Sequence, residues 1–123
     1  MKCSCSINAG ISEYAKLFSS GWVKSRSVHK CTECGKKMLP GEGYYRERVK
    51  FDGRFSAHKT CNDCISIRSN LCGDWTYGQV LETVSDAIEA GHDIPERCLS
   101  KLTPAARAWV CDLIEKLWEN EKK

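Results

Sequence analysis

The chain has 123 residues, 41% hydrophobic and 28% charged, which predicts one small domain or one small domain with a helical extension. No stretch approaches the roughly 20 apolar residues that cross a bilayer, and no apolar run of a signal peptide follows Met1. These features predict a cytoplasmic protein with no membrane partner. In that compartment nine cysteines are better suited to metal coordination than to disulfides.

The net charge of +3 is unevenly distributed along the chain. Residues 21–60 contain ten Lys or Arg and four acids, a balance of +6. Residues 74–123 contain six Lys or Arg and ten acids, a balance of −4. A basic segment is compatible with nucleic-acid binding, and a solvated protein surface explains such charges about as often.

The first cysteines form a Cys3-x-Cys5 pair, which is close enough to share one ion. A second metal site could combine this pair with Cys72 and either His29 or His58, and would tie the N-terminus to the rest of the chain. The alternative is that these are reduced thiols and a surface histidine without a metal. The sequence therefore predicts one or two Zn²⁺ ions per chain.

The segment between this pair and the next cysteines has local periodicity. Apolar residues at positions 11, 14, 15 and 18 predict two helical turns over residues 11–18, ended by Ser19-Ser20-Gly21. A strand is expected over residues 22–28, and the large side chain of Trp22 is expected to pack in the fold rather than to bind a ligand.

Two Cys-x-x-Cys pairs, Cys31/Cys34 and Cys61/Cys64, are separated by 26 residues and form the strongest motif of the chain. Two such pairs with a spacer of this size are typical of a tetrahedral zinc site. Gly35 directly follows the first pair, where a tight turn needs a residue that tolerates positive φ. The spacing therefore predicts a four-cysteine site with the first pair on a knuckle.

The spacer between the pairs predicts a β-hairpin followed by a helix. Residues 44–51 are rich in strand-favouring side chains, Asp52-Gly53 is typical of a type I′ turn, and residues 54–57 can return as the second strand. Residues 61–68 then predict the first turns of a helix, with Thr60 as its cap.

The order of knuckle, hairpin and ligand-bearing helix over residues 29–70 resembles the treble-clef family of zinc fingers. The resemblance implies an α+β fold, a small zinc-stabilised treble clef at residues 1–73, and leaves the activity open. The alternative set Cys31, Cys34, His58 and Cys61 resembles half of a LIM domain. LIM domains have a further cysteine three residues after Cys64, where this chain has Ile67, so the four-cysteine set is favoured.

Residues 74–123 predict a helical C-terminal extension packed on the finger or on a partner. A helix is expected over 76–90 with Asp74 or Thr76 as its cap, and a short one over 95–101. Thr103-Pro104 is typical of a helix start, and the last helix is expected to run to about residue 119. Cys98 and Cys111 lack metal spacing and are expected to be small core residues.

The favoured function is protein interaction, in which the apolar stripe of the last helix, with Trp109 and Trp118, docks on a partner. Residues 1–80 also resemble small cysteine-rich bacteriophage proteins, which implies an inhibitor of a host or defence enzyme. The alternative is a nucleic-acid-binding zinc finger in which Tyr44 or Tyr45 stacks on bases. Its phosphate contacts would be Lys24, Arg26, Lys36, Lys37, Arg46, Arg48, Lys50 and Arg54.

Catalysis is not expected, because metal spacing already accounts for the cysteines and histidines that could serve as nucleophile and base. A metal-dependent nuclease remains a third hypothesis, since His58 and Asn62 lie near the hairpin and helix positions that such an enzyme would use. The sequence leaves the oligomeric state open.

Overall fold

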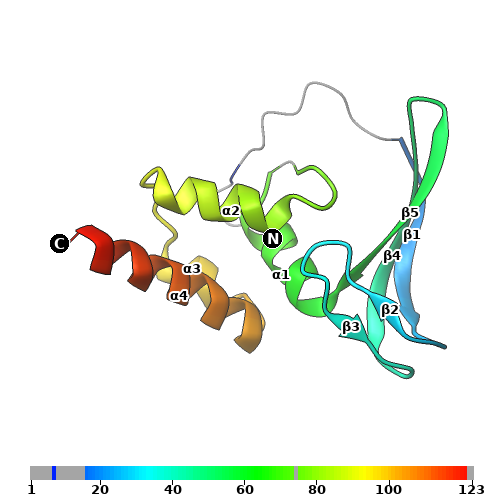
Figure 1. Ribbon diagram of the computed structural model, residues 1–123, viewed down its shortest axis with the longest axis horizontal. Helices are drawn as coiled ribbons and strands as arrows, with labels where there is room; N and C mark the ends of the chain where they lie inside the picture. Colours follow the sequence, from blue (N-terminus) through cyan, green and yellow to red (C-terminus); the bar gives the residue numbers. More distant parts are fainter. Residues whose placement is uncertain (1–6, 8–15, 74, 122–123) are drawn as a thin grey trace.

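The computed structural model describes residues 7, 16–73 and 75–121 as five strands and four helices (Figure 1). The strands are β1 (Lys16–Lys24), β2 (His29–Lys30), β3 (Lys37–Met38), β4 (Gly43–Phe51) and β5 (Arg54–Cys61). The helices are α1 (Asn62–Leu71), α2 (Val80–Glu89), α3 (Glu96–Leu99) and α4 (Pro104–Glu121). The fold class is α+β, with the helices gathered on one side of a three-stranded sheet.

The three-stranded sheet has the order β1-β4-β5 and is antiparallel throughout. Its second connection is the predicted hairpin: Asp52 and Gly53 have φ values of 51° and 77°, and both are positive as a type I′ turn requires. The second strand of the hairpin is longer than expected, because pairing with β4 continues to Cys61 opposite Tyr44.

The prediction of helix over residues 11–18 is wrong for residues 16–18, which open strand β1. Leu17 lies opposite Val49 and Ser19 opposite Arg48, with a register shift at Phe18. Pairing with β4 satisfies the backbone of this segment, a long-range contact that outweighs the local periodicity. Residues 11–15 lie outside the described residues. The strand expected over 22–28 is correct only for residues 22–24, which end β1; residues 25–28 form a bend before β2, so the prediction is wrong there.

Helix α1 begins after Cys61 rather than at it, and the prediction of Thr60 as its cap is wrong. The N-cap is Cys61, with no side-chain hydrogen bond, and the hydroxyl of Thr60 is buried without a partner among the described residues. Thr60 belongs to β5 opposite Tyr45, so its side chain lies on the same face of the sheet as that of Tyr45.

The link between sheet and helices is a buried ion pair. Arg68 of α1 donates to Glu47 of β4 at 2.7 Å, and both side chains are almost fully buried. The hydroxyl of Tyr77 donates to the second carboxylate oxygen of Glu47 at 2.8 Å, and the guanidinium of Arg68 lies 4.4 Å from the ring centroid of Trp75. One face of the sheet is thereby covered by α1 and the segment that follows it.

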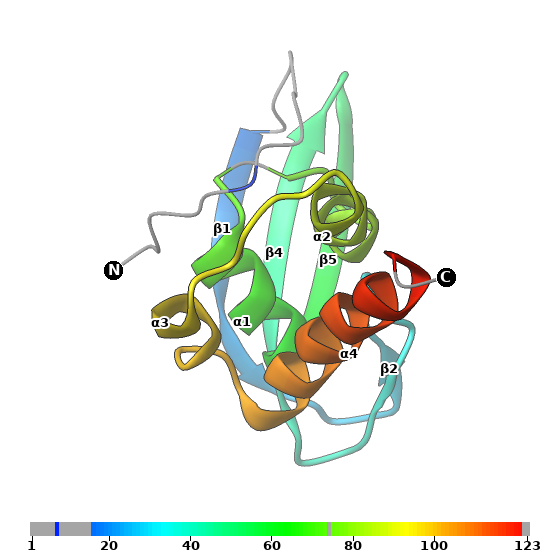
Figure 2. The same cartoon turned by 90° about the vertical axis from the view of Figure 1, so that its left-hand side faces the viewer.

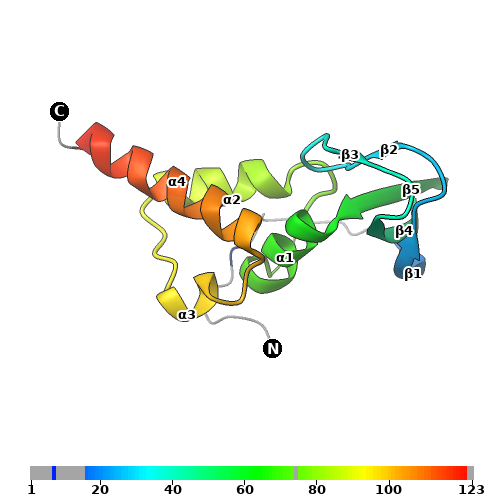
Figure 3. The ribbon, with the colours of Figure 1, turned by 90° about the horizontal axis from the view of Figure 1, so that it is seen from below.

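The helical extension is formed, but two helices differ from their expected bounds: α3 covers Glu96–Leu99 instead of 95–101, and α2 starts later than expected. This helix begins at Val80 instead of residue 76, with Gln79 at the N-cap position, so the prediction of Thr76 as the cap is wrong; Asp74 lies outside the described residues. Thr103 does cap α4, since its hydroxyl accepts from the backbone N–H of Ala106 at 3.3 Å. Figures 2 and 3 show α2 and α4 running beside α1. No helix of the described ranges is long and apolar enough to cross a membrane.

The described residues form two separate hydrophobic clusters. The larger joins α1 to the extension and consists of Ile7, Ile67, Leu71, Cys72, Val80, Val84, Ile88, Ile94, Cys98, Leu99, Leu102, Ala106 and Val110. The smaller lies where the knuckle meets the hairpin and consists of Cys31, Met38, Tyr44, Cys61 and Cys64. Because α1 contributes to both clusters, it connects the sheet to the extension.

Candidate metal centre

The knuckle places the first two cysteines on a tight turn between β2 and β3. The backbone N–H of Gly35 donates to the carbonyl of Cys31 at 3.0 Å, and that of Cys31 donates to the carbonyl of Lys36 at 2.9 Å. Gly35 has φ of 74°, the left-handed conformation expected at this position. The turn thus directs two sulfurs to the same side.

The second pair comes from the junction of β5 and α1. Cys61 ends the strand and Cys64 lies in the first turn of the helix. Thr32 of the knuckle fixes the two pairs relative to each other: its N–H donates to the carbonyl of Lys59 at 2.7 Å, and its hydroxyl accepts from the N–H of Lys59 at 3.2 Å. A strand and a turn distant in sequence are thereby joined beside the four sulfurs.

The four cysteines Cys31, Cys34, Cys61 and Cys64 lie close together, with all ligand atoms within 4.8 Å of one another. The Sγ atoms of Cys34 and Cys61 are 3.9 Å apart. A tetrahedral zinc ion with Zn–S bonds of about 2.3 Å holds its sulfurs roughly 3.8 Å apart. The donor set is all sulfur, as in the four-cysteine class of structural zinc sites, so these residues fit Zn²⁺.

The electrostatics of the cluster favour a cation. Hydrogen bonds from the thiols of Cys61 and Cys64 lower the pKa of Cys31, and the backbone N–H of Cys61 also points at its sulfur at 3.4 Å. The hydrogen bond to Cys31 raises the pKa of Cys61 to about 11. Hydrogen bonds to Cys31 and Cys61 raise the pKa of Cys64. A thiolate at one cysteine therefore opposes ionisation of the neighbouring thiols. All four can be thiolates together only when a bound cation offsets their mutual repulsion.

The residues between the paired cysteines hold the helical extension. Glu33, inside the first pair, accepts hydrogen bonds from the backbone N–H groups of Gly78 at 2.8 Å and Val80 at 2.9 Å, where α2 begins. Asp63, inside the second pair, accepts from the hydroxyl of Thr103 at 2.6 Å, where α4 begins. Sequence reasoning missed both contacts because the partners are 40 or more residues apart in the chain.

The two histidines named in the sequence analysis lie elsewhere. The His29 ring is 3.1 Å from the ammonium of Lys59 and meets the ring of Tyr44 edge-on. The His58 ring stacks on Tyr77 with centroids 3.9 Å apart, and its partial burial lowers its pKa. Neither belongs to the group of described residues that could share one ion, so the LIM-like set containing His58 is not the one that the structure brings together.

The other cysteines of the predicted second site are only partly described. Cys72 is buried and lies beside Ile7 in a parallel β-bridge. Cys3 and Cys5 lie outside the described residues. Cys98 is fully buried, as expected, but it is disulfide-bonded, which corrects the expectation of a plain core thiol. Cys111 is a half-buried thiol of α4.

The basic side chains proposed for nucleic acid are divided between the sheet and the knuckle. Arg46, Arg48 and Lys50 alternate along β4 and therefore share one face, whereas Lys24 and Arg54 lie at the ends of β1 and β5. The remaining three, Arg26, Lys36 and Lys37, are exposed around the knuckle.

Neither aromatic residue expected to stack on bases is fully exposed. Tyr44 is buried in the cysteine cluster, and Tyr45 packs edge-on against Trp22. Phe18 and Phe55 are each about half exposed, with centroids 5.1 Å apart, and Trp22 and Phe51 are exposed to a similar extent. Sequence reasoning missed the pair of Phe18 and Phe55. The alternation of β4 with the Asp52-Gly53 turn places Phe55 beside the Arg and Lys residues of β4, but Phe18 reaches it only through the irregularity in β1.

Comparison of this chain with known protein families, with curated proteins and with solved structures finds no match.

Proposed function

We propose that this protein is a zinc-stabilised module, of treble-clef type at the metal, that binds single-stranded nucleic acid on the uncovered face of its three-stranded sheet. The knuckle, hairpin and ligand-bearing helix occur in treble-clef order, which supports the first half of the proposal. Zinc serves structure here: with four cysteine ligands it has no open position for a substrate. Binding rather than catalysis is therefore the proposed role.

A face defined here as the basic aromatic face supports the second half. It consists of Lys16, Phe18, Arg46, Arg48, Lys50 and Phe55. Phe55 lies opposite Lys50 in the hairpin, and its ring is 5.5 Å from the guanidinium of Arg48 and 5.3 Å from the ammonium of Lys50. The ammonium of Lys16 lies 5.4 Å from the centroid of Phe18. Two exposed rings are thus surrounded by cations.

The charge balance of the sheet is the observation that carries the proposal. Strands β1, β4 and β5 contain seven Lys or Arg residues and a single acid, Glu47, which is buried on the opposite face and neutralised by Arg68. No acid of these strands therefore opposes a polyanion on the basic aromatic face. Flat exposed rings among cations are suited to stacking with unpaired bases while the cations contact phosphates. Residues 75–121, which contain nine acids and four Lys or Arg, lie on the helical side, and charges beyond a Debye length of about 8 Å are largely screened.

Fluorescence anisotropy with single-stranded and duplex oligonucleotides at two salt concentrations tests this proposal. We expect single strands to bind more tightly than duplex, with affinity falling steeply as salt rises. The double variant Arg48→Gln/Lys50→Gln should reduce the slope of log K against log salt by roughly 1.4, since each lost contact removes about 0.7 for single strands.

Two single variants separate stacking from charge. Phe55→Ala should weaken binding about tenfold without changing the salt slope, because stacking contributes roughly 1–3 kcal/mol per base. Lys101→Gln, an exposed cation of the extension, is the matched control and should bind as the wild type does. Equal affinity of the wild type and the Arg48→Gln/Lys50→Gln variant would refute the proposal.

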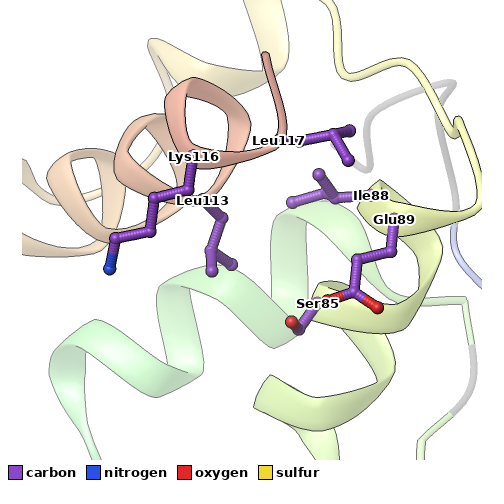
Figure 4. Close-up of a pocket in the computed structure, with 6 residues that line it drawn as sticks. All are labelled: Ser85, Ile88, Glu89, Leu113, Lys116 and Leu117. Atoms are coloured by element: carbon purple, nitrogen blue, oxygen red, sulfur yellow. The ribbon is translucent and has the colours of Figure 1, made fainter. Parts of the chain in front are cut away.

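A protein partner remains the second candidate, and one observation favours it. A hollow of about 430 Å³ between α2 and α4 is lined by Ser85, Ile88, Glu89, Leu113, Lys116 and Leu117 (Figure 4). The neighbouring Trp118 is 61% exposed. The rest of the α4 stripe, including Trp109, packs against the larger core, so less anchoring surface is open than the sequence suggested. An inhibitor of a host or defence enzyme would dock here, and Trp118→Ala would abolish its action while leaving nucleic-acid binding intact.

A further inference from the structure

Two cations lie directly opposite each other at the end of the basic aromatic face that is nearest the knuckle. Arg46 of β4 pairs with Lys59 of β5, so both side chains lie on the same side of the sheet. None of the ion pairs among the described residues involves either of them. Like charges directly opposite on neighbouring strands destabilise a sheet. A bound anion would offset this repulsion.

The knuckle holds Lys59 in place. The ammonium of Lys59 lies 3.1 Å from Nδ1 of His29, and its backbone N–H and carbonyl bond to Thr32. Because an ammonium group can only donate, Nδ1 accepts, and the neutral ring carries its proton on Nε2, 3.2 Å from the hydroxyl oxygen of Ser27. One hydrogen of the ammonium is thus engaged by His29, and two remain for a ligand.

The other flank of Arg46 is open. Its partner on β1 is Gly21, and apart from chain neighbours no heavy atom lies within 4 Å of the position that a Cβ would take there. In the next row of the same face, Ser19 and Ala57 lie on either side of Arg48. Small residues beside both arginines leave room for a group the size of a phosphate.

The knuckle also limits how far a bound strand can follow the sheet. The next residue of β4 on this face is Tyr44, which is buried against His29 and shares a cluster with Met38. Figure 1 shows β2 and β3 at the end of β4 that lies away from the β4–β5 turn. A single strand that follows β4 from Phe55 therefore meets the knuckle just beyond Arg46. The group that fits at this point is the terminal phosphate of the strand.

We propose that Arg46 and Lys59, with Lys59 positioned by the knuckle, form a site for a terminal phosphate monoester of a single strand. The inference rests on the proposed function and deepens it by naming which strands bind best. A terminal monoester carries about 1.5 to 2 negative charges at pH 7, whereas an internal phosphate carries one. A guanidinium and an ammonium without an acidic partner suit the more highly charged group and its three free oxygens.

Fluorescence anisotropy with short oligothymidylates that differ only at their ends tests the site. One strand has a 5′-phosphate, one a 3′-phosphate and one only hydroxyl ends, each with its fluorophore on an internal base. We expect a phosphorylated strand to bind about tenfold more tightly than the hydroxyl strand, since hydrogen bonds between charged groups are the stronger ones. The end that gives the larger gain assigns the direction of the strand along β4.

The outcomes separate this inference from the proposed function. Equal affinity of all three strands would overturn the terminal-phosphate site and leave single-strand binding standing. No binding of any strand would overturn both.

A matched pair of variants assigns the gain to the site. Lys59→Gln should reduce it from about tenfold to about twofold or less, because glutamine can still donate to His29 but has no charge. Lys30 is exposed and follows His29 in β2, so its side chain lies on the other side of that strand. Lys30→Gln should therefore keep the full gain. A gain that is unchanged in Lys59→Gln would overturn the proposal.

Inorganic phosphate distinguishes a strand end from a free anion. Replacing chloride by phosphate at equal ionic strength should raise the Tm of the wild type more than that of Lys59→Gln, because a ligand that binds the folded state stabilises it. The same shift in both proteins would show that Lys59 holds no phosphate. A larger shift in the wild type combined with equal affinity of the three strands would mean that the site takes a free anion, and would overturn the assignment to a strand end.

Discussion

The sheet half (residues 16–61) and the helical half (residues 62–73 and 75–121) differ in what stabilises them. The small cluster of the sheet half contains five buried residues with Cys64, and three of the five are cysteines. The cluster of the helical half, which Ile7 joins, contains thirteen buried residues, eleven of them without a sulfur atom. Because so small an apolar cluster cannot offset the entropy of ordering the sheet half, we expect metal binding to supply the difference. The helical half relies on ordinary burial.

Removing a ligand from the metal centre should destabilise the sheet half more than any other change considered, and should leave the helical half largely intact. We expect Cys64→Ser to lose one zinc ion and to destabilise the sheet half by up to about 10 kcal/mol, the scale of structural zinc binding. Amide cross-peaks of residues 29–61 should collapse in a ¹⁵N correlation spectrum, whereas those at the centres of α2 and α4 persist. Cys111→Ser is the control. Retention of dispersed β4 and β5 peaks in Cys64→Ser would contradict the account.

Breaking the buried ion pair that links the two halves should have the second largest effect on stability. Arg68→Met leaves the Glu47 carboxylate buried without its cation, a change that costs about 3–5 kcal/mol. The paired variant Arg68→Met/Glu47→Leu removes both charges and should recover much of that loss in urea unfolding, although the hydroxyl of Tyr77 then loses its acceptor. A paired variant as unstable as Arg68→Met alone would show that the carboxylate is not the source of the cost.

A smaller effect is expected at the carboxylate that joins the knuckle to α2. Glu33→Gln keeps one acceptor and loses the charge that faces the first N–H groups of the helix, and should cost about 1 kcal/mol. Hydrogen exchange should accelerate at residues 78–81 while the zinc content stays the same. Glu82→Gln, an exposed acid in the first turn of α2, is the matched control. Equal exchange rates in both variants would show that Glu33 does not stabilise the start of α2.

The smallest predicted effect is a pH dependence at the interface between β5 and Tyr77. Burial lowers the pKa of His58 below its usual value; Glu47 opposes the shift and Arg68 adds to it. The unfolded chain therefore binds the proton more readily, so this contribution to stability is present above about pH 6.5 and is lost as the pH falls below it.

Free energies of unfolding between pH 7.5 and pH 5.5, in excess zinc, measure this contribution. The wild type should lose more stability over the range than His58→Gln does. Because both proteins share the same thiolates, acid release of zinc cancels in the comparison. Identical pH profiles would mean that the His58 ring titrates normally.

The parts of the fold that the sequence predicts are those with local chemistry. The Cys-x-x-Cys spacing, the Asp52-Gly53 turn and the Thr103-Pro104 helix start each depend on residues that are neighbours in the chain. The four close sulfurs follow from the same local rule applied twice. Local patterns are therefore a sufficient guide to the metal centre and to the long terminal helix.

The parts that the sequence misses depend on distant partners. Residues 16–18 have helical spacing, but β4 supplies an edge with which they pair. Thr60 has the position of a helix cap in the sequence, but β5 extends past it. Helix α2 starts at Val80, later than expected, because Glu33 supplies hydrogen-bond acceptors there. Tyr44 is buried and Phe55 exposed because the knuckle covers only one end of the sheet.

Hydrogen exchange before and after zinc chelation tests the central claim most directly. Native mass spectrometry should first show zinc bound to the reduced wild type. After chelation by a high-affinity chelator, we predict loss of protection across residues 29–61, while the centres of α2 and α4 stay protected and only their starts, held by Glu33 and Asp63, exchange faster. A protein that is purified without metal and keeps full protection of β4 and β5 would contradict the account.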